Sequence, residues 1–257
     1  MFAIAEQGTP RSAEKGSSVT ELVLTVAGDR AAAAARLLTD HTPLRAVARP
    51  VPRDSAKLLT AVRALDADAV FLTGTDPVAA RTAQLALAGE LTVFTEEDTL
   101  AIAIAAAVRV ALSRRGRTPG DARVLVAGPS ALPFLMPVLL ATGVADLTLW
   151  HPADAAAFPL AELARDVDVV VDPRGRHEPG PGPAVVTPGD PVAPLLALPG
   201  LLGDGPRAGD PQAHPDVHAA CAWALAGLTP VDRLLPELAD PDLASRVAGA
   251  VAAARLR

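Results

Sequence analysis

Three consecutive acidic residues, Glu96, Glu97 and Asp98, separate an apolar run from a long alanine-rich segment. Adjacent carboxylates are hard oxygen ligands for a divalent cation, and a buried carboxylate can also transfer protons. Acids at the start of a helix equally serve as caps and as favourable charges for the helix dipole. The residue types are compatible with both a residual metal site and a capping cluster. Asp76, shortly after another apolar run, could approach the same place.

A second set of residues has the spacing of a nucleotide-binding turn. The segment VLVAGPSALPF (124–134) places Gly128, Ser130 and Pro133 where dinucleotide-binding turns have three glycines. Gly128 can form the tight turn, and we expect NAD or NADP, if either binds, to contact Gly128, Ser130 and Ala131. Ser130 would cap the following helix, from about Ala131, and leave its N-terminus facing an anion. We interpret the turn as the remains of a dinucleotide site.

Two further groups of residues could act on a substrate. His151 follows Trp150 at the end of an apolar run, where an imidazole could serve as an acid or base. Arg174 and Arg176, with His177, could hold a carboxylate or phosphate. A surface histidine and a solvated Gly/Pro-rich loop are the simpler interpretations of these two segments.

Apolar runs that alternate with helical patterns must position these residues. This alternation predicts an α/β fold with parallel sheets covered by helices, and ligands of such sheets bind at the carboxyl ends of the strands. Strands are expected over 20–26, 44–51, 68–74, 91–95, 123–128, 147–150, 167–173 and 183–188. Helices are expected to follow Asp76-Pro77 and to cover about 29–38, 55–65, 98–114, 131–142, 155–164, 216–226 and 241–254.

The composition excludes several classes of protein. A net charge of -6 argues against general binding to nucleic acid or to anionic lipid. No uncharged apolar run reaches the ~18 residues of a membrane span, and we see no signal peptide. The single cysteine, Cys221, suits a reducing compartment, so we expect a cytoplasmic protein. Abundant alanine and arginine are typical of a GC-rich genome, such as an actinobacterial one.

Several segments, in the same order and spacing, resemble the malic enzymes, a family that oxidatively decarboxylates malate with NAD(P). They are DADAVFLTGTDPVAAR (66–81), LTVFTEEDTLAIAIAAAVRVALSRRGRTPGDARVLVAG (91–128), LPGLLGD (198–204), AACAWALAGL (219–228) and LLPELADPDLASRVAGAVAAA (234–254). The resemblance implies a C-terminal Rossmann-like NAD(P)-binding domain behind a smaller N-terminal α/β portion. We expect a flexible lead-in over 1–18, a shortened N-terminal domain over 19–95 and a Rossmann-like domain over 96–257.

The residues that carry the family's chemistry are largely missing. The family's general acid is a tyrosine, and this chain has none; its general base is a lysine, and Lys15 and Lys57 fall outside the matching element. Of the three acidic metal ligands, the Glu-Asp pair falls on Thr73 and Gly74, and only Glu96 and Glu97 match the Asp-Asp position. The family's asparagines fall on the apolar segment 193–197.

The resemblance and these losses together predict a degenerate member that lacks malate oxidative decarboxylation. It would act as a scaffold, a partner subunit or a ligand sensor, as a homo-oligomer or with a partner protein. We do not expect a divalent metal, although Glu97 is a possible ligand, and NAD or NADP binding stays open. The alternative is an enzyme with a rebuilt cleft, whose candidate catalytic residues are Glu96, Glu97, Asp76 and His151. A cleft acid with a raised pKa would favour that alternative, whereas a cleft filled by Leu195, Leu196 and Phe134 would count against it.

Overall fold

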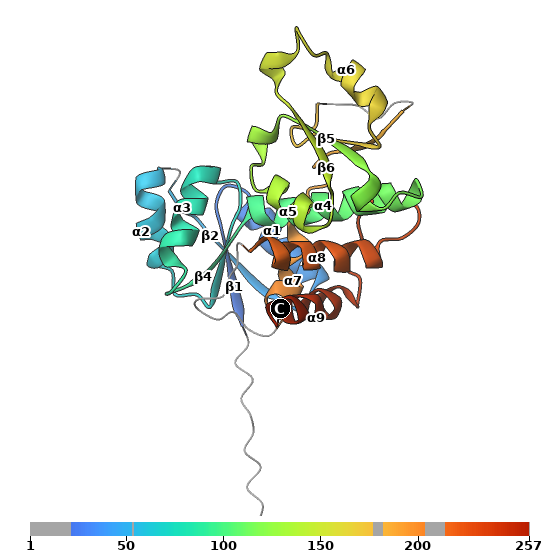
Figure 1. Cartoon of the computed structure of the whole chain (residues 1–257). Coiled ribbons are helices and arrows are strands. Elements are labelled where there is room, and N and C mark those ends of the chain that lie inside the picture. Colours follow the sequence, from blue (N-terminus) through green and yellow to red (C-terminus); the bar gives the residue numbers. More distant parts are fainter. Residues whose placement is uncertain (1–21, 53, 177–181, 204–213, 257) are drawn as a thin grey trace, which may run out of the picture.

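The computed structural model describes residues 22–52, 54–176, 182–203 and 214–256, which contain two parallel four-stranded sheets (Figure 1). The first has the order β2-β1-β3-β4 and the second the order β6-β5-β7-β8. The strands are β1 (Val23–Ala27), β2 (Arg45–Arg49), β3 (Ala69–Leu72), β4 (Thr92–Thr95), β5 (Arg123–Ala127), β6 (Asp146–Trp150), β7 (Val169–Val171) and β8 (Ala184–Val186). The predicted α/β class is confirmed. The expected lead-in over 1–18 lies outside the described residues.

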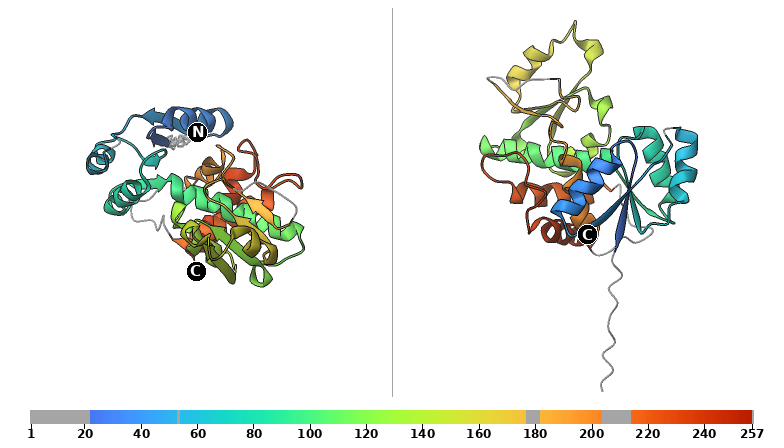
Figure 2. Two further views of the ribbon diagram at one scale, coloured as in Figure 1. Left: turned by 90° about the horizontal axis from the view of Figure 1, so that it is seen from above. Right: turned by 180° about the vertical axis from the view of Figure 1, so that it is seen from behind.

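Helices cover both faces of the first sheet. Successive side chains of a strand point to opposite faces, and in β3 the side chains on both faces are apolar and buried. Val70 and Leu72 of β3 pack against α2 (Ser55–Arg63) and α3 (Pro77–Leu87). Ala69 and Phe71 belong to the core on the other face, together with residues of α1 (Ala31–His41) and α4 (Glu96–Arg114). Figure 2 shows α1 and the α2/α3 pair on opposite sides of this sheet.

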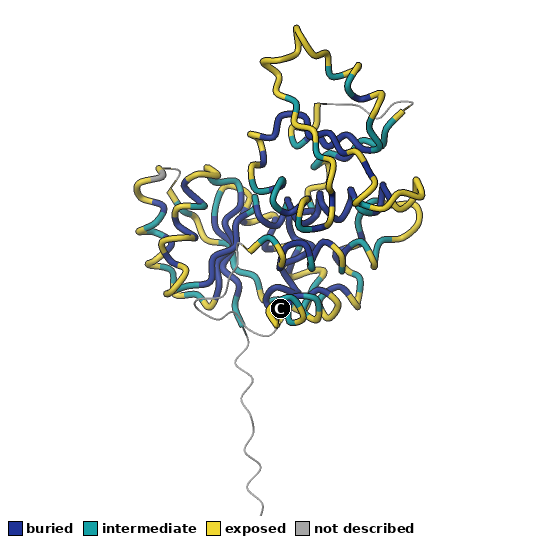
Figure 3. Tube along the Cα trace, in the orientation of Figure 1, coloured by how far each residue is buried: buried dark blue, intermediate teal, exposed yellow. Residues whose placement is uncertain are grey.

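The helix α4 lies between the two sheets and joins their cores. Thirteen of its nineteen residues are buried, as expected for a helix that is apolar on all sides. Its surroundings include β4, β7, β8, α5 (Leu135–Ala141) and α8 (Pro215–Leu228). One hydrophobic cluster therefore runs from β1 through α4 to α7 (Leu198–Leu201) and α9 (Leu243–Arg255). Buried residues are dark blue in Figure 3. The domain division after residue 95 stays a prediction.

The expected helix over 131–142 begins later than the sequence pattern suggested. Gly128 adopts a left-handed conformation, with φ 76°, and a 3₁₀ turn follows over Pro129–Ala131. Leu132 has φ -148° and ψ 72°, outside the helical region, because the ring of Pro133 disfavours helical backbone in the preceding residue. The helix α5 starts at Leu135, with Phe134 at its N-cap and no capping side chain. The expected Ser130 cap is therefore wrong.

A proline also shortens the expected helix over 155–164. Its regular part is α6 (Leu160–Leu163), preceded by a 3₁₀ turn over Pro152–Asp154 and followed by another over Ala164–Asp166. Pro159 occupies the N-cap of α6 and prevents helix from extending through Phe158. Phe158, just before Pro159, is 59% exposed. Among the described residues, none of the helices has the length and hydropathy of a membrane span.

Candidate functional site

The carboxyl ends of both sheets surround a cavity of about 330 Å³. Its lining comes from the ends of β3 and β4, from the turn after β5 and from the loop after β8, and it includes Leu72, Thr75, Thr95, Glu96, Glu97, Ala131, Leu132, Pro188 and Pro194. A second cavity, of about 500 Å³, is lined by Val78, Arg81, Glu97, Ser130, Ala131 and Phe134 among others. Glu97 and Ala131 line both, so the expected edge of the fold does hold a cleft.

Two glycines let the backbone segments at this edge approach one another. A Cβ atom on Gly28, after β1, would lie 1.9 Å from the carbonyl oxygen of Thr73. Gly74 has φ 65°, and its Cβ would lie 3.2 Å from the backbone nitrogen of Arg30. Side chains at these positions would push β1 and β3 apart, so the glycines bring Arg30, Thr73 and Gly74 together beside the start of α4.

Glu96 is surrounded by hydrogen-bond donors of the first sheet. The Thr73 hydroxyl donates to Glu96 Oε2 at 3.0 Å, and the Gly74 N–H donates to the same oxygen at 2.8 Å. Arg30 Nη2 forms an ion pair with Glu96 Oε1 at 2.5 Å. Thr73 and Gly74 are the positions at which the malic-enzyme resemblance places two carboxylates. In this chain both positions provide donors, and both donate to Glu96.

Asp98 is buried and fully engaged within the chain, with only 1% of the residue exposed. Arg81 Nη2 donates to its Oδ1 at 2.5 Å, while Gln84 Nε2 and the Thr95 hydroxyl donate to its Oδ2 at 2.7 and 2.9 Å. The Asp98 N–H in turn donates to Thr95 Oγ1, which makes Thr95 the N-cap of α4. A buried carboxylate requires such partners because desolvation alone would be too costly.

Glu97 is the least neutralised of the three acids. Burial raises the pKa of its carboxyl above the usual value, although the nearby Arg81 guanidinium and a hydrogen bond from the Phe134 backbone both act to lower that pKa. Arg81 Nη2 lies 3.9 Å from Glu97 Oε2, farther than from Asp98. The Arg81 guanidinium also stacks on the Phe134 ring at 4.7 Å from its centroid. Arg81 and Glu97 thus connect α3 and α4 to the turn after β5.

The acidic residues do not fit a divalent metal ion. Glu96 and Asp98 already neutralise Arg30 and Arg81, so a cation at the cleft would have to displace a guanidinium from each. Ca²⁺ prefers six to eight oxygen ligands, and Mg²⁺ prefers an octahedron of oxygen ligands that includes one or two carboxylates. Within the described part of the chain, no three His, Cys, Asp or Glu side chains are placed to hold a metal ion.

At the turn after β5, the side chain of Arg174 lies over Gly128. A Cβ on Gly128 would lie 3.0 Å from Arg174 Nε, and Arg174 Nη2 donates to Ser130 Oγ at 3.4 Å. The Asp172 carboxylate accepts hydrogen bonds from the N–H groups of Arg174 and Arg176, which fixes the loop that carries them. Ser130, Ala131 and Arg174 are exposed, so this cation remains accessible; His177 lies outside the described residues.

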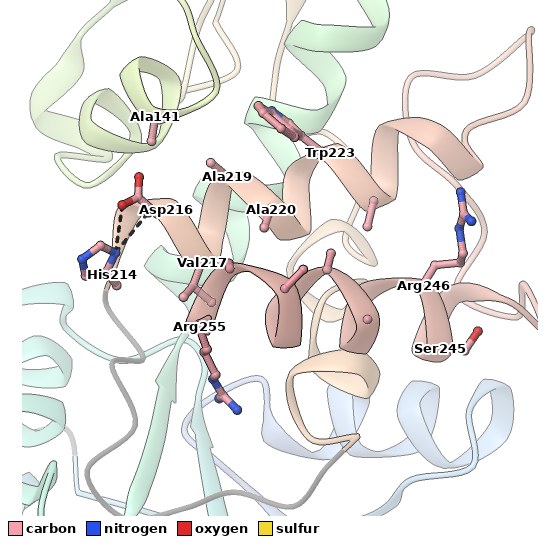
Figure 4. A pocket seen from close by; sticks show the side chains of 15 residues that line it. Ala141, His214, Asp216, Val217, Ala219, Ala220, Trp223, Ser245, Arg246 and Arg255 are labelled. Carbon is pink, nitrogen blue, oxygen red and sulfur yellow. Dashed lines mark hydrogen bonds and ion pairs between the residues drawn. The ribbon is translucent and has the colours of Figure 1, made fainter. Parts of the chain in front are cut away.

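The other candidate residues have different surroundings. Asp76 is exposed and caps α3 by accepting from the Ala79 N–H at 2.8 Å. His151 is exposed at the end of β6 and lines neither cleft cavity. A wider groove of about 900 Å³ is lined mainly by residues of α8 and α9 (Figure 4). Sequence patterns assigned no role to Arg30 or Arg81, because both act through neighbours that only the tertiary structure brings close.

The two sheets, the helix between them and the cleft at their carboxyl ends define a malic-enzyme-like fold. Malic enzyme from Entamoeba histolytica superposes with a TM-score of 0.71 over 91% of this chain and 69% of that chain, at 14% identity. NAD-dependent malic enzyme from Thermotoga maritima superposes with a TM-score of 0.67 over 90% of this chain and 84% of that chain, at 16% sequence identity. Malic enzyme from Pyrococcus horikoshii superposes with a TM-score of 0.67 over 91% of this chain and 76% of that chain, at 14% sequence identity. The resemblance seen in the sequence is therefore confirmed for the fold, which is shortened relative to these structures.

No protein-family model matches the sequence, and no curated protein matches it either. At the identities above, the likeness to malic enzymes concerns the fold. The function has to be inferred from the cleft residues themselves.

We expect the Arg81–Asp98 pair to be a main source of stability at the cleft. Arg81→Met leaves the buried Asp98 carboxylate without a cation, and breaking a buried pair in this way costs roughly 3–5 kcal/mol. Arg63→Met is the matched control, since Arg63 pairs with Glu90 at an exposed site where both side chains are more than half accessible. Loss of such a pair costs about 0–1 kcal/mol. Urea unfolding measures the free energy of unfolding of both variants. Equal losses of stability in Arg81→Met and Arg63→Met would contradict a structural role for Arg81.

The double variant Arg81→Met/Asp98→Asn separates the missing charge from the missing packing. The amide that replaces the Asp98 carboxylate keeps a hydrogen-bonding group without the buried charge, so the double variant should recover a substantial part of the lost stability. A double variant as unstable as Arg81→Met alone would show that Asp98 does not depend on the arginine.

Proposed function

We propose that this protein is a pseudoenzyme with a malic-enzyme-like fold, which lacks malate oxidative decarboxylation and acts by binding. Its role would be that of a scaffold, a partner subunit or a ligand sensor, without a divalent metal. One observation carries the proposal: Thr73 and Gly74, at the positions of two acidic metal ligands of the family, donate hydrogen bonds to Glu96, while Arg30 supplies the positive charge.

The chemistry that remains at the cleft supports this proposal. The chain contains no tyrosine that could protonate an enolate. Of its two lysines, Lys15 lies outside the described residues, and Lys57 lies on α2 with Asp54 as its ion-pair partner. Groups that polarise or protonate the reacting centre typically contribute factors of roughly 10²–10⁴ in rate each. The absence of several such groups would leave malate turnover undetectable.

Association with a second copy or with a partner protein is part of the proposal. Val78 and Leu85 of α3 are 75% and 65% exposed, and they lie two turns apart on the same side of the helix. An interface formed by the N-terminal portion requires exposed apolar residues of this kind.

Malate-dependent reduction of NAD or NADP tests the proposal directly. With purified protein, malate and Mg²⁺ or Mn²⁺, we expect no rate above that of a heat-killed sample. The mass of the same protein is measured by size-exclusion chromatography with light scattering, where we expect an assembly larger than the monomer. A rate that scales with protein concentration would contradict the loss of activity, and a monomer at micromolar concentration would contradict the association.

A second candidate function is an enzyme of the oxidoreductase superfamily with a rebuilt cleft that still binds NAD(P). Two observations favour it: the raised pKa of Glu97 beside a cavity, and the accessible Arg174 guanidinium over Gly128. A half-buried acid in a cleft is a typical general acid or base, and an arginine is a natural phosphate ligand. Of the residues that would fill the cleft, only Phe134 lines a cleft cavity, while Leu195 and Leu196 are core residues.

Energy transfer from tryptophan to NADH or NADPH tests this second candidate. Trp150 is suited to the measurement because its carbonyl accepts the Gly128 N–H at 2.8 Å, at the turn in question. Saturable transfer at micromolar cofactor that Arg174→Met weakens and Arg165→Met leaves unchanged would support it. No transfer up to about 1 mM cofactor, an affinity too weak for a resident cofactor, would reject it.

A further inference from the structure

A half-buried arginine in the second half of α4 has no anionic partner among the described residues. Arg109 Nε is buried and has no hydrogen-bond partner there, and no described ion pair involves this side chain. Burial lowers the pKa of the Arg109 guanidinium, and no carboxylate of the described part of the chain counteracts this effect. A desolvated cation without a counter-charge is unfavourable, so the arrangement needs an explanation.

The described partner of Arg109 is the ring of Trp223 on α8. The Arg109 guanidinium carbon lies 5.1 Å from the ring centroid, within the range of a cation–π interaction. Trp223 is 46% exposed, which is high for the largest side chain of the chain. In Figure 4 Trp223 projects from α8 on the side of α4, away from Arg246 and Arg255. The aromatic ring fixes the guanidinium in place but does not neutralise it.

Arg109 and Trp223 line a cavity of about 340 Å³ between the end of α4, the end of α8 and the loop that follows α8. None of its lining residues is acidic, whereas two are arginines; the lining comprises Arg109, Val110, Ser113, Arg114, Trp223, Ala226, Gly227, Thr229, Pro230 and Val231. Arg114 donates to the backbone carbonyls of Pro230 and Arg233, so it holds the loop in place and adds positive potential. The volume is within the range of small-molecule sites.

We propose that this cavity binds a small-molecule oxyanion, a carboxylate or a phosphate, through the Arg109 guanidinium. The guanidinium forms paired hydrogen bonds with either group, and its low exposure to water strengthens them. The Ser113 hydroxyl on the same lining is a further donor. The site is lined by the ends of α4 and α8 and by the loop after α8, and it shares no lining residue with the cleft cavities.

The experiment uses the full chain with Trp150→Phe, so that emission reports Trp223 alone. Inorganic phosphate and succinate are titrated separately at constant ionic strength, which is maintained with sodium chloride so that general screening does not change. We expect a saturable change in emission with half-saturation at about 1 mM or below for at least one of the two anions. The anion that saturates the signal identifies the ligand class as phosphate or carboxylate.

Two substitutions make the assignment specific. Arg109→Met should raise the half-saturation concentration at least roughly tenfold, the effect of losing a charged hydrogen-bonding partner. Arg36→Met on the exposed face of α1 is the matched control and should leave it unchanged. Saturation that survives Arg109→Met, or no saturable change up to about 50 mM anion, would overturn the proposal.

Thermal unfolding checks that the Arg109 variant is folded and provides an independent readout. In chloride alone, Arg109→Met should unfold at the same temperature as the parent or above it, because it removes a buried unpaired donor. Phosphate or succinate should raise the unfolding temperature of the parent and of Arg36→Met but not that of Arg109→Met. Equal stabilisation of all three proteins would mean that the anion binds elsewhere, and would also overturn the proposal.

Discussion

The buried carboxylate of Asp98 is the constraint on which the cleft of this protein depends. It lies at the start of α4, the helix that joins the two sheets, and Arg81 supplies its counter-charge from α3. The same guanidinium stacks on Phe134, at the turn after β5. Removing the cation would leave a charge in a poorly solvated place, so the positions of α3, α4 and that turn are coupled through one side chain.

The chemistry of the cleft follows from how the acidic triplet is neutralised. In a site for a divalent cation, several carboxylates converge on one point and the metal supplies the positive charge. Here Glu96 and Asp98 point to different arginines, Arg30 and Arg81, and the strand end at Thr73-Gly74 supplies donors. Burial raises the pKa of the Glu97 carboxyl, and one half-buried acid suffices for proton transfer but not for holding a dication. The malic-enzyme-like fold thus encloses a cleft in which Glu96 and Asp98 are each paired with an arginine.

The sequence predicted the strands and most helices because apolar periodicity and turn residues are local signals. It failed where a proline acts on the residue before it: Leu132 leaves the helical region before Pro133, and the regular helix α6 begins only after Pro159. The cleft was located correctly from the strand ends. The pairing of Glu96 with Arg30 was not predictable, since it depends on Gly28 and Gly74 allowing β1 and β3 to approach. Charges distant in the sequence reveal their partners only in three dimensions.

A titration with Mn²⁺, followed by electron paramagnetic resonance of the free ion, tests the central claim most directly. If the arginines neutralise Glu96 and Asp98, the free Mn²⁺ signal should rise in proportion to total Mn²⁺ up to about 1 mM, with and without malate. One Mn²⁺ bound per chain at micromolar concentration, and lost in Glu97→Gln, would contradict the account, because it would show that the acidic residues still converge on a cation.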